Sequence, residues 1–135
     1  MSKQEEAALT LKVYELSRED ALRKAREWYF RDFHPHSIAN FNDGMFSEHS
    51  GQLRTLVSFW DMAAALVNDG AISLELFNNT HTEHIVVFAK IEPLLKEIRE
   101  AFAPEFAVNL EKLVDATPGG RRRTARARER LKTLR

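Results

Sequence analysis

The segment at residues 52–68, QLRTLVSFWDMAAALVN, constrains the fold of this chain more than any other part of the sequence. Its apolar residues recur at spacings of three and four, which predicts an α-helix. They also cover most of the helix circumference, and a helix of this kind lies buried among other elements. We therefore expect residues 52–68 to form the central helix of the domain, with an inward stripe of Leu53, Leu56, Val57, Trp60, Ala63, Ala64 and Val67.

A second helical pattern covers residues 5–33, where apolar residues are again three or four apart. Ser17 and Asp20 are spaced like a capping box, so two helices that meet near Leu16 are an alternative to one long helix. Pro35 ends this helical region, because the residue before a proline disfavours helical backbone.

The tripeptide Asn-Asp-Gly occurs twice, ending at Gly44 and at Gly70, and the residues that follow are similar in the two places. An internal duplication is one interpretation. The favoured one is that each tripeptide ends a helix, since glycine readily adopts the left-handed conformation of a helix C-terminus. We expect a short helix that starts after Ser37 and ends at Gly44, and another over residues 73–79.

The remaining apolar pattern predicts a long helix over residues 82–102, kinked where Pro93 interrupts its hydrogen bonds. Pro104 is expected at the first turn of a further short helix. No segment has a convincing strand pattern. The predicted fold is therefore all-α: a compact bundle of about four main helices with short connecting helices.

Composition limits the chemistry that is available. The 135 residues contain no cysteine, which excludes disulfides, cysteine zinc sites and cysteine nucleophiles. A chain of this length forms one domain. The most apolar window, residues 56–67, is too short and too polar to span a membrane, and the acidic N-terminus is unlike a secretory signal. We expect a cytoplasmic protein without a membrane span.

The formal net charge of zero conceals an asymmetry. Residues 1–115 contain 19 acidic and 12 basic residues, whereas residues 116–135 contain one acidic and eight basic residues. Such a division indicates an interaction tail. We expect a helical domain over residues 1–115, a linker (ATPGG) over residues 116–120, and a basic tail, helical or disordered, over residues 121–135.

Three segments, VYELSREDALRKAREWYFRDFHP, LVSFWDMAAALVNDGAISLELF and KIEPLLKEIREAF, occur in that order and resemble an uncharacterised bacterial family, the domain of unknown function 4760. The resemblance covers about residues 9–114. It implies a small helical domain and no catalytic residues, because the family has no assigned activity. The resemblance also implies a transmembrane segment ahead of the domain in many members, but we expect no membrane attachment for this chain. The matching positions include Tyr14, Glu15, Leu16, Arg26, Trp28, Phe33, Pro35, Trp60, Asp61, Met62, Gly70, Phe77, Glu83, Pro93, Leu110 and Glu111.

The histidines raise the question of a metal site. His81 and His84 are three residues apart and could share a helix face, and histidine with carboxylate is a common ligand set. No spacing matches a known metal motif, and no phosphate loop or nucleophile elbow is present. The favoured interpretation is that these are surface histidines at helix starts, so we expect no catalytic residues and no cofactor.

The polar side of residues 52–68 carries Arg54, Ser58 and Asp61. These residues could line a small polar groove. Alternatively, Asp61 could form a structural ion pair with Arg26 or Arg54 that ties two helices together, and this second interpretation is favoured.

The basic tail is the last candidate site. It could bind phosphates in a salt-dependent way, but it lacks aromatic residues for base stacking. A disordered tail, or a helix docked on the acidic body of its own or a neighbouring chain, is favoured over nucleic-acid binding. The arginines that would contact phosphate or an acidic partner are Arg121, Arg122, Arg123, Arg126, Arg128 and Arg130.

The favoured function is a non-enzymatic protein-interaction or regulatory module with an unidentified protein partner or with itself. The alternative is a nucleic-acid-associated protein that uses the tail. The third hypothesis is a metal-binding protein or enzyme that uses the histidines.

Overall fold

The computed structural model describes residues 2–134, and every regular element in that range is helical. The all-α prediction is therefore confirmed. Within this range, no helix is both long enough and apolar enough to cross a membrane. The elements in chain order are α1 (Lys3–Ser17), α2 (Asp20–Arg31), α3 (Ile38–Met45), α4 (Ser50–Asn68), α5 (Leu74–Thr80), α6 (Glu83–Ile91), the 3₁₀ turn η1 (Glu92–Leu94), α7 (Leu95–Ala101), α8 (Val108–Ala116) and α9 (Gly120–Thr133).

Helix α4 is the centre of the domain, as its sequence pattern predicts. It packs most extensively against α2 and α8, and it also contacts α3, α5 and α6. Arg54 and Ser58 are exposed on the opposite side of α4, in agreement with the predicted polar side, whereas the apolar Met62 is also exposed there. Its buried residues are Leu53, Leu56, Val57, Trp60, Ala63, Ala64 and Val67, the same set as the predicted stripe.

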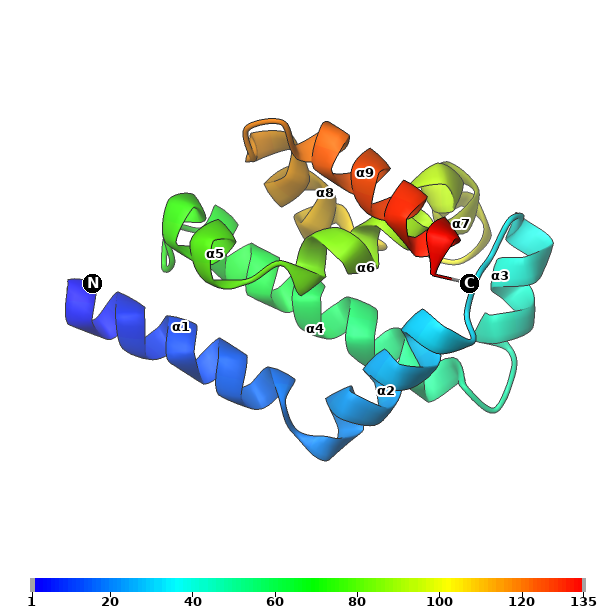
Figure 1. Cartoon of the computed structure of the whole chain (residues 1–135), viewed down its shortest axis with the longest axis horizontal. Helices are drawn as coiled ribbons and strands as arrows, with labels where there is room; N and C mark the ends of the chain where they lie inside the picture. Colours follow the sequence, from blue (N-terminus) through cyan, green and yellow to red (C-terminus); the bar gives the residue numbers. More distant parts are fainter. Residues whose placement is uncertain (1, 135) are drawn as a thin grey trace.

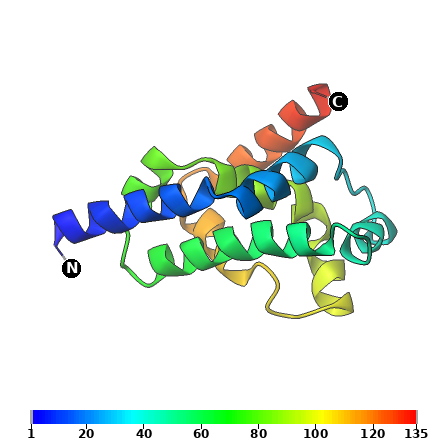
Figure 2. The same cartoon turned by 90° about the horizontal axis from the view of Figure 1, so that it is seen from below.

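The other helices lie on two sides of α4. In the view of Figure 1, α1 and α2 lie on one side and α6 and α9 on the other, with α4 between them. Figure 2, turned by 90°, shows α1 and α2 in front of the other helices and α9 at the end of the molecule away from the start of α1. Packing is extensive between α6 and α9, and α9 also contacts α8. The last helix is therefore part of the packed domain.

The N-terminal region forms two helices, so the alternative with a break near Leu16 is correct. The predicted capping box at this break is wrong. Ser17 is the last residue of α1, and its hydroxyl donates to the carbonyl of Tyr14. Glu19 occupies the N-cap of α2 without a side-chain hydrogen bond. A capping box does occur at the start of α1, where Ser2 and Glu5 each accept a hydrogen bond from the other's backbone.

The two Asn-Asp-Gly segments have different conformations. Gly70 follows α4 with a φ of 91°, as expected for a helix C-terminus. Gly44, in contrast, lies inside α3, which continues to Met45, so the predicted helix end is wrong. A Cβ at Gly44 would lie 2.7 Å from the ring of Phe33, so glycine serves close packing at this position. Ser37 caps α3 as predicted, by accepting from the backbone of Asn40.

Pro93 and Pro104 also differ from each other. Pro93 lies in η1, which separates α6 from α7, in agreement with the predicted interruption. Pro104 does not start a helix. The chain forms turns there, and α8 begins at Val108 after Ala107, whose φ is 56°. Ala107 has no capping side chain, so the first turn of α8 needs a partner from elsewhere.

Candidate functional site

Asp61 supplies the missing cap of α8. One carboxylate oxygen accepts from the backbone N–H of Leu110 at 2.9 Å, and the other accepts from the side-chain amide of Asn109 at 3.0 Å. A negative charge at a helix N-terminus is stabilised by the helix dipole and by the free N–H groups of the first turn. Asp61 thus joins α4 to α8 and has a structural role in the described chain.

Arg26 belongs to a second network, on the other side of α4. Its guanidinium forms a bidentate pair with Glu83 and also donates to the carbonyl of Ser17 at 2.8 Å. Glu83 in addition accepts from the indole N–H of Trp60 at 2.7 Å. This carboxylate therefore connects α2, α4 and α6, and it holds the end of α1 in place through Arg26.

The structure does not bring together the four residues predicted for the polar groove or the ion pair, Arg26, Arg54, Ser58 and Asp61. Among the described residues, the partners of Asp61 are Asn109 and Leu110, so the expected ion pair with Arg26 or Arg54 is not formed. Arg54 is exposed, and its backbone carbonyl accepts from the hydroxyl of Ser58. The four residues hold helices together or face solvent.

His81 and His84 lie inside the core. His84 is fully buried, and its Nε2 lies 2.9 Å from the side-chain oxygen of Asn78. The ring of Phe77 packs against both imidazoles, with centroids at 4.8 Å and 4.6 Å. Burial, with smaller contributions from the neighbouring His81 and Arg123, lowers the pKa of His84 to about 3. The expectation of surface histidines is therefore wrong.

These buried rings also offer little to a metal. Within residues 2–134, no group of three or more histidine, aspartate or glutamate side chains is placed to hold an ion. The ring of Phe77 is stacked on His81 and tilted against His84, and the ring of Trp60 contacts both imidazoles at an angle. The arrangement has the character of an aromatic core with two neutral histidines.

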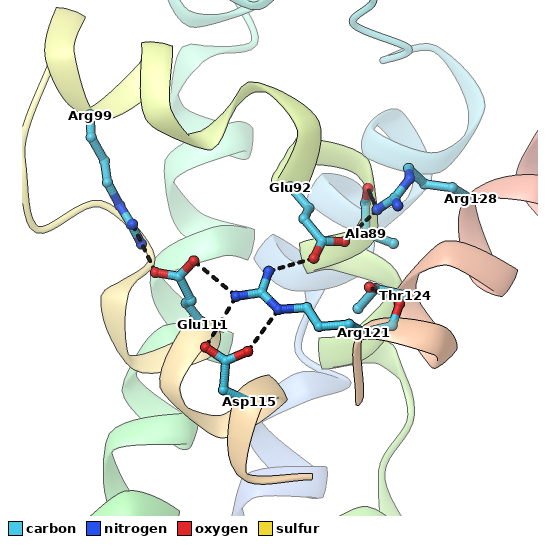
Figure 3. Close-up of polar contacts among 8 residues, drawn as sticks. All are labelled: Ala89, Glu92, Arg99, Glu111, Asp115, Arg121, Thr124 and Arg128. Atoms are coloured by element: carbon cyan, nitrogen blue, oxygen red, sulfur yellow. Dashed lines mark hydrogen bonds and ion pairs between the residues drawn. The ribbon is translucent and has the colours of Figure 1, made fainter. Parts of the chain in front are cut away.

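Arg121, in the first turn of α9, anchors the C-terminal helix to the rest of the domain. The Arg121 guanidinium donates to Asp115 at 2.7 Å, to Glu92 at 2.5 Å and to Glu111 at 3.1 Å (Figure 3). Glu111 also accepts from Arg99 at 2.8 Å. These hydrogen bonds connect α9 to η1, α7 and α8. The hydrogen bond with Asp115, above all, raises the pKa of Arg121, so this residue stays charged.

A second arginine fixes the next turns of α9. Arg128 donates to Glu92 at 2.5 Å and to the carbonyl of Ala89 at 3.1 Å, which ties the helix to the end of α6 (Figure 3). Burial by itself would raise the pKa of Glu92, but hydrogen bonds from Arg121, Thr124 and Arg128 outweigh this effect and lower it. Three arginines and three carboxylates thus form one balanced network beneath α9.

The remaining arginines of α9 are arranged differently. Arg122, Arg126 and Arg130 are exposed, and Arg123 is half-buried. Within the described range, none of these four side chains is paired with a carboxylate. Of the six tail arginines predicted as contacts, two therefore bind the domain itself and four carry uncompensated charge.

A groove runs between α6 and α9 beside these free charges. Its volume is about 340 Å³. It is lined by apolar side chains from both helices, a set called the floor, and by arginines from α9, a set called the wall. The floor consists of Ile85, Val86, Ala127, Leu131 and Leu134, and the wall consists of Arg123, Arg126 and Arg130.

Sequence reasoning did not identify the acidic partners of the tail. Glu111 and Asp115 are four residues apart, so they share a helix face, and this spacing could have indicated a site for a cation. Glu92 gave no such signal, because its position depends on the turn at Pro93. The sequence also did not reveal Val86 as a groove residue. This side chain is only partly buried, and it lines the groove because α9 packs beside α6.

The fold and its networks define a small all-α domain whose last helix is held by arginine–carboxylate pairs. The chain belongs to the family defined by a domain of unknown function (DUF4760), whose model matches residues 4–117. The resemblance drawn from the sequence is thereby confirmed. The match ends before α9, so the helix that carries the free arginines lies outside it. Neither a curated protein nor a solved structure shows significant similarity to the chain.

Proposed function

We propose that the chain is a non-enzymatic protein-interaction module and that the outward face of α9 is its binding surface. The observation that carries this proposal is the division of the arginines within one helix. Arg121 and Arg128 fix α9 to the domain, whereas Arg122, Arg126 and Arg130 present exposed charge without carboxylate partners among the described residues. A rigid helix with free cations is suited to an acidic partner.

The apolar groove beside these arginines supports a protein partner. Protein interfaces combine an apolar centre with a polar rim, and the residues between α6 and α9 provide both. The buried positions of His81 and His84 support a non-enzymatic role, because each histidine has packing partners in the core.

Site-specific photo-cross-linking in cells tests the proposal. A photoreactive residue at Arg126 is expected to give a discrete protein adduct, whereas the same residue at the exposed Lys24 on α2 is expected not to give it. Substitution of Arg122 and Arg130 by glutamine should weaken the adduct, because the flanking charges are removed. Identical adducts from both positions, or no adduct from Arg126, would contradict the proposal.

Nucleic-acid binding is the second candidate, supported by the same exposed arginines. Binding of a DNA duplex or an RNA of about 20 nucleotides, followed by fluorescence anisotropy, would then fall steeply between about 50 and 200 mM salt. The protein-interaction proposal instead expects weak retention of either nucleic acid at the higher salt. Nuclease-sensitive adducts in the cross-linking experiment would favour this second function.

A further inference from the structure

We infer that the groove between α6 and α9 binds an acidic amphipathic helix, which places aliphatic side chains on the groove floor and carboxylates against the arginine wall. This inference rests on the proposed function and assigns the chemistry of the partner. It depends on three features: the spacing of the charges, the character of the floor and the rigidity of α9.

The charges of the wall are distributed along the groove. Arg123, Arg126 and Arg130 are three and four residues apart, so they share one face of α9 and extend along about 10 Å of its axis. A ligand with a single charged head, such as a fatty acid, would match one of these arginines only. A helix with acidic residues at spacings of three or four matches all of them.

The residues of the floor favour a peptide over a nucleic acid as the occupant of the groove. It is formed by Ile85, Val86, Ala127, Leu131 and Leu134, all of which are aliphatic. Bases bind such surfaces poorly, because single-stranded nucleic acids need aromatic platforms and duplexes need open access to phosphates. Leucine, valine and alanine side chains of an amphipathic helix fit an aliphatic groove between two helices.

The helix that carries the wall is already fixed to the domain before a partner binds. Arg121 and Arg128 hold α9 against Glu92, and the side chain of Thr124 is fully buried under the helix. A preformed groove loses little conformational entropy on binding. Leu134 at its open end is 76% exposed, which leaves apolar surface for a partner to cover.

The experiment uses the full chain and three synthetic peptides of about 14 residues, or four helical turns. The first is an amphipathic helix with leucine on one face and glutamate beside it. The second replaces each glutamate by glutamine, and the third keeps the composition but disperses the leucines around the helix. We expect the first peptide to bind at least about tenfold more tightly than either of the others, since the groove needs both features. Equal binding of the dispersed peptide would overturn the inference, because charge alone would then suffice.

Substitutions in the protein complete the test. The triple variant Arg123→Gln, Arg126→Gln, Arg130→Gln and the single variant Leu131→Ser should each weaken binding of the first peptide. Arg54→Gln is the matched control, since it removes an exposed arginine charge from α4 that does not line the groove, and it should leave binding within about twofold. Circular dichroism melting of every variant verifies that the fold is kept. Unchanged affinity in the triple variant would overturn the inference.

Other occupants of the groove give different results. Sedimentation of the chain alone as an oligomer that Leu131→Ser dissociates would place a second copy in the groove and overturn the inference. Tighter binding of a DNA duplex than of the acidic peptide would also overturn the inference, because nucleic acid would then be the better ligand. If no peptide binds while the cross-link from Arg126 captures a protein, the inference fails and the proposed function stands. If no peptide binds and Arg126 gives no protein adduct, the inference and the proposed function both fail.

Discussion

Replacing Gly120 by alanine is expected to lower the free energy of unfolding by about 2–4 kcal/mol. Gly120 is the first residue of α9 and is buried where this helix meets the end of α8. A Cβ at this position would lie 1.9 Å from the carbonyl oxygen of Val114, which is a backbone atom and cannot rotate away. The two helices must therefore separate, and the arginine network below α9 would be strained with them.

Gly51 provides the matched control for this substitution. It is the second residue of α4, it is exposed, and no atom outside its own helix backbone lies within 4 Å of a Cβ built there. Gly51→Ala is expected to raise stability by about 0.5–1 kcal/mol, because alanine restricts the unfolded chain and favours a helix. Urea unfolding of both variants measures the difference. Equal stability of Gly120→Ala and the parent chain would show that α9 is not packed against Val114.

Acidification is expected to destabilise the fold through His84. Its folded pKa of about 3 lies below the ordinary value of 6.5, so the unfolded chain binds one more proton between these two pH values. The stabilisation is fully present above pH 6.5 and is lost as the pH falls toward 3. At pH 4.5 the loss from this residue amounts to about 2–3 kcal/mol.

The variant His84→Gln isolates this contribution. Glutamine retains an amide that can bond Asn78 but does not titrate, so the variant should be less stable at neutral pH and depend less on pH. Carboxylates titrate in both proteins and cancel in the comparison, and His81, whose pKa burial also lowers, remains in both. The measurement is urea unfolding at pH 7 and pH 4.5. The same loss of stability in both proteins would contradict the role given to His84.

Local sequence patterns predict the fold correctly where the residues of one helix alone decide which of its faces is buried and where it ends. The apolar stripe of α4 is correct residue by residue, because a helix with so little polar surface can only be buried. Gly70 and Ser37 were also predictable, since each acts on its immediate neighbours. Gly44 was not, because its role depends on the ring of Phe33 from a different part of the chain.

The candidate site was less predictable, because its geometry depends on contacts distant in sequence. Charge asymmetry drew attention to the tail, but it could not separate Arg121 from Arg122. That separation follows from the side of α9 that faces Glu92 and Glu111. From the sequence, the favoured partner of Asp61 is an arginine, because a carboxylate and a guanidinium carry opposite charges. In the fold it caps α8, whose own N-cap residue, Ala107, has no suitable side chain.

Amide hydrogen exchange tests most directly whether α9 is a fixed part of the domain. We expect the amides in the middle of α9, from Thr124 to Leu131, to be protected to within about tenfold of those in α6, because the two helices pack together. In Arg121→Met, protection in α9 should fall while that in α4 is maintained. Exchange of the α9 amides at the rate of an unstructured peptide, with α4 and α6 fully protected, would contradict the central claim that this helix is docked on the domain.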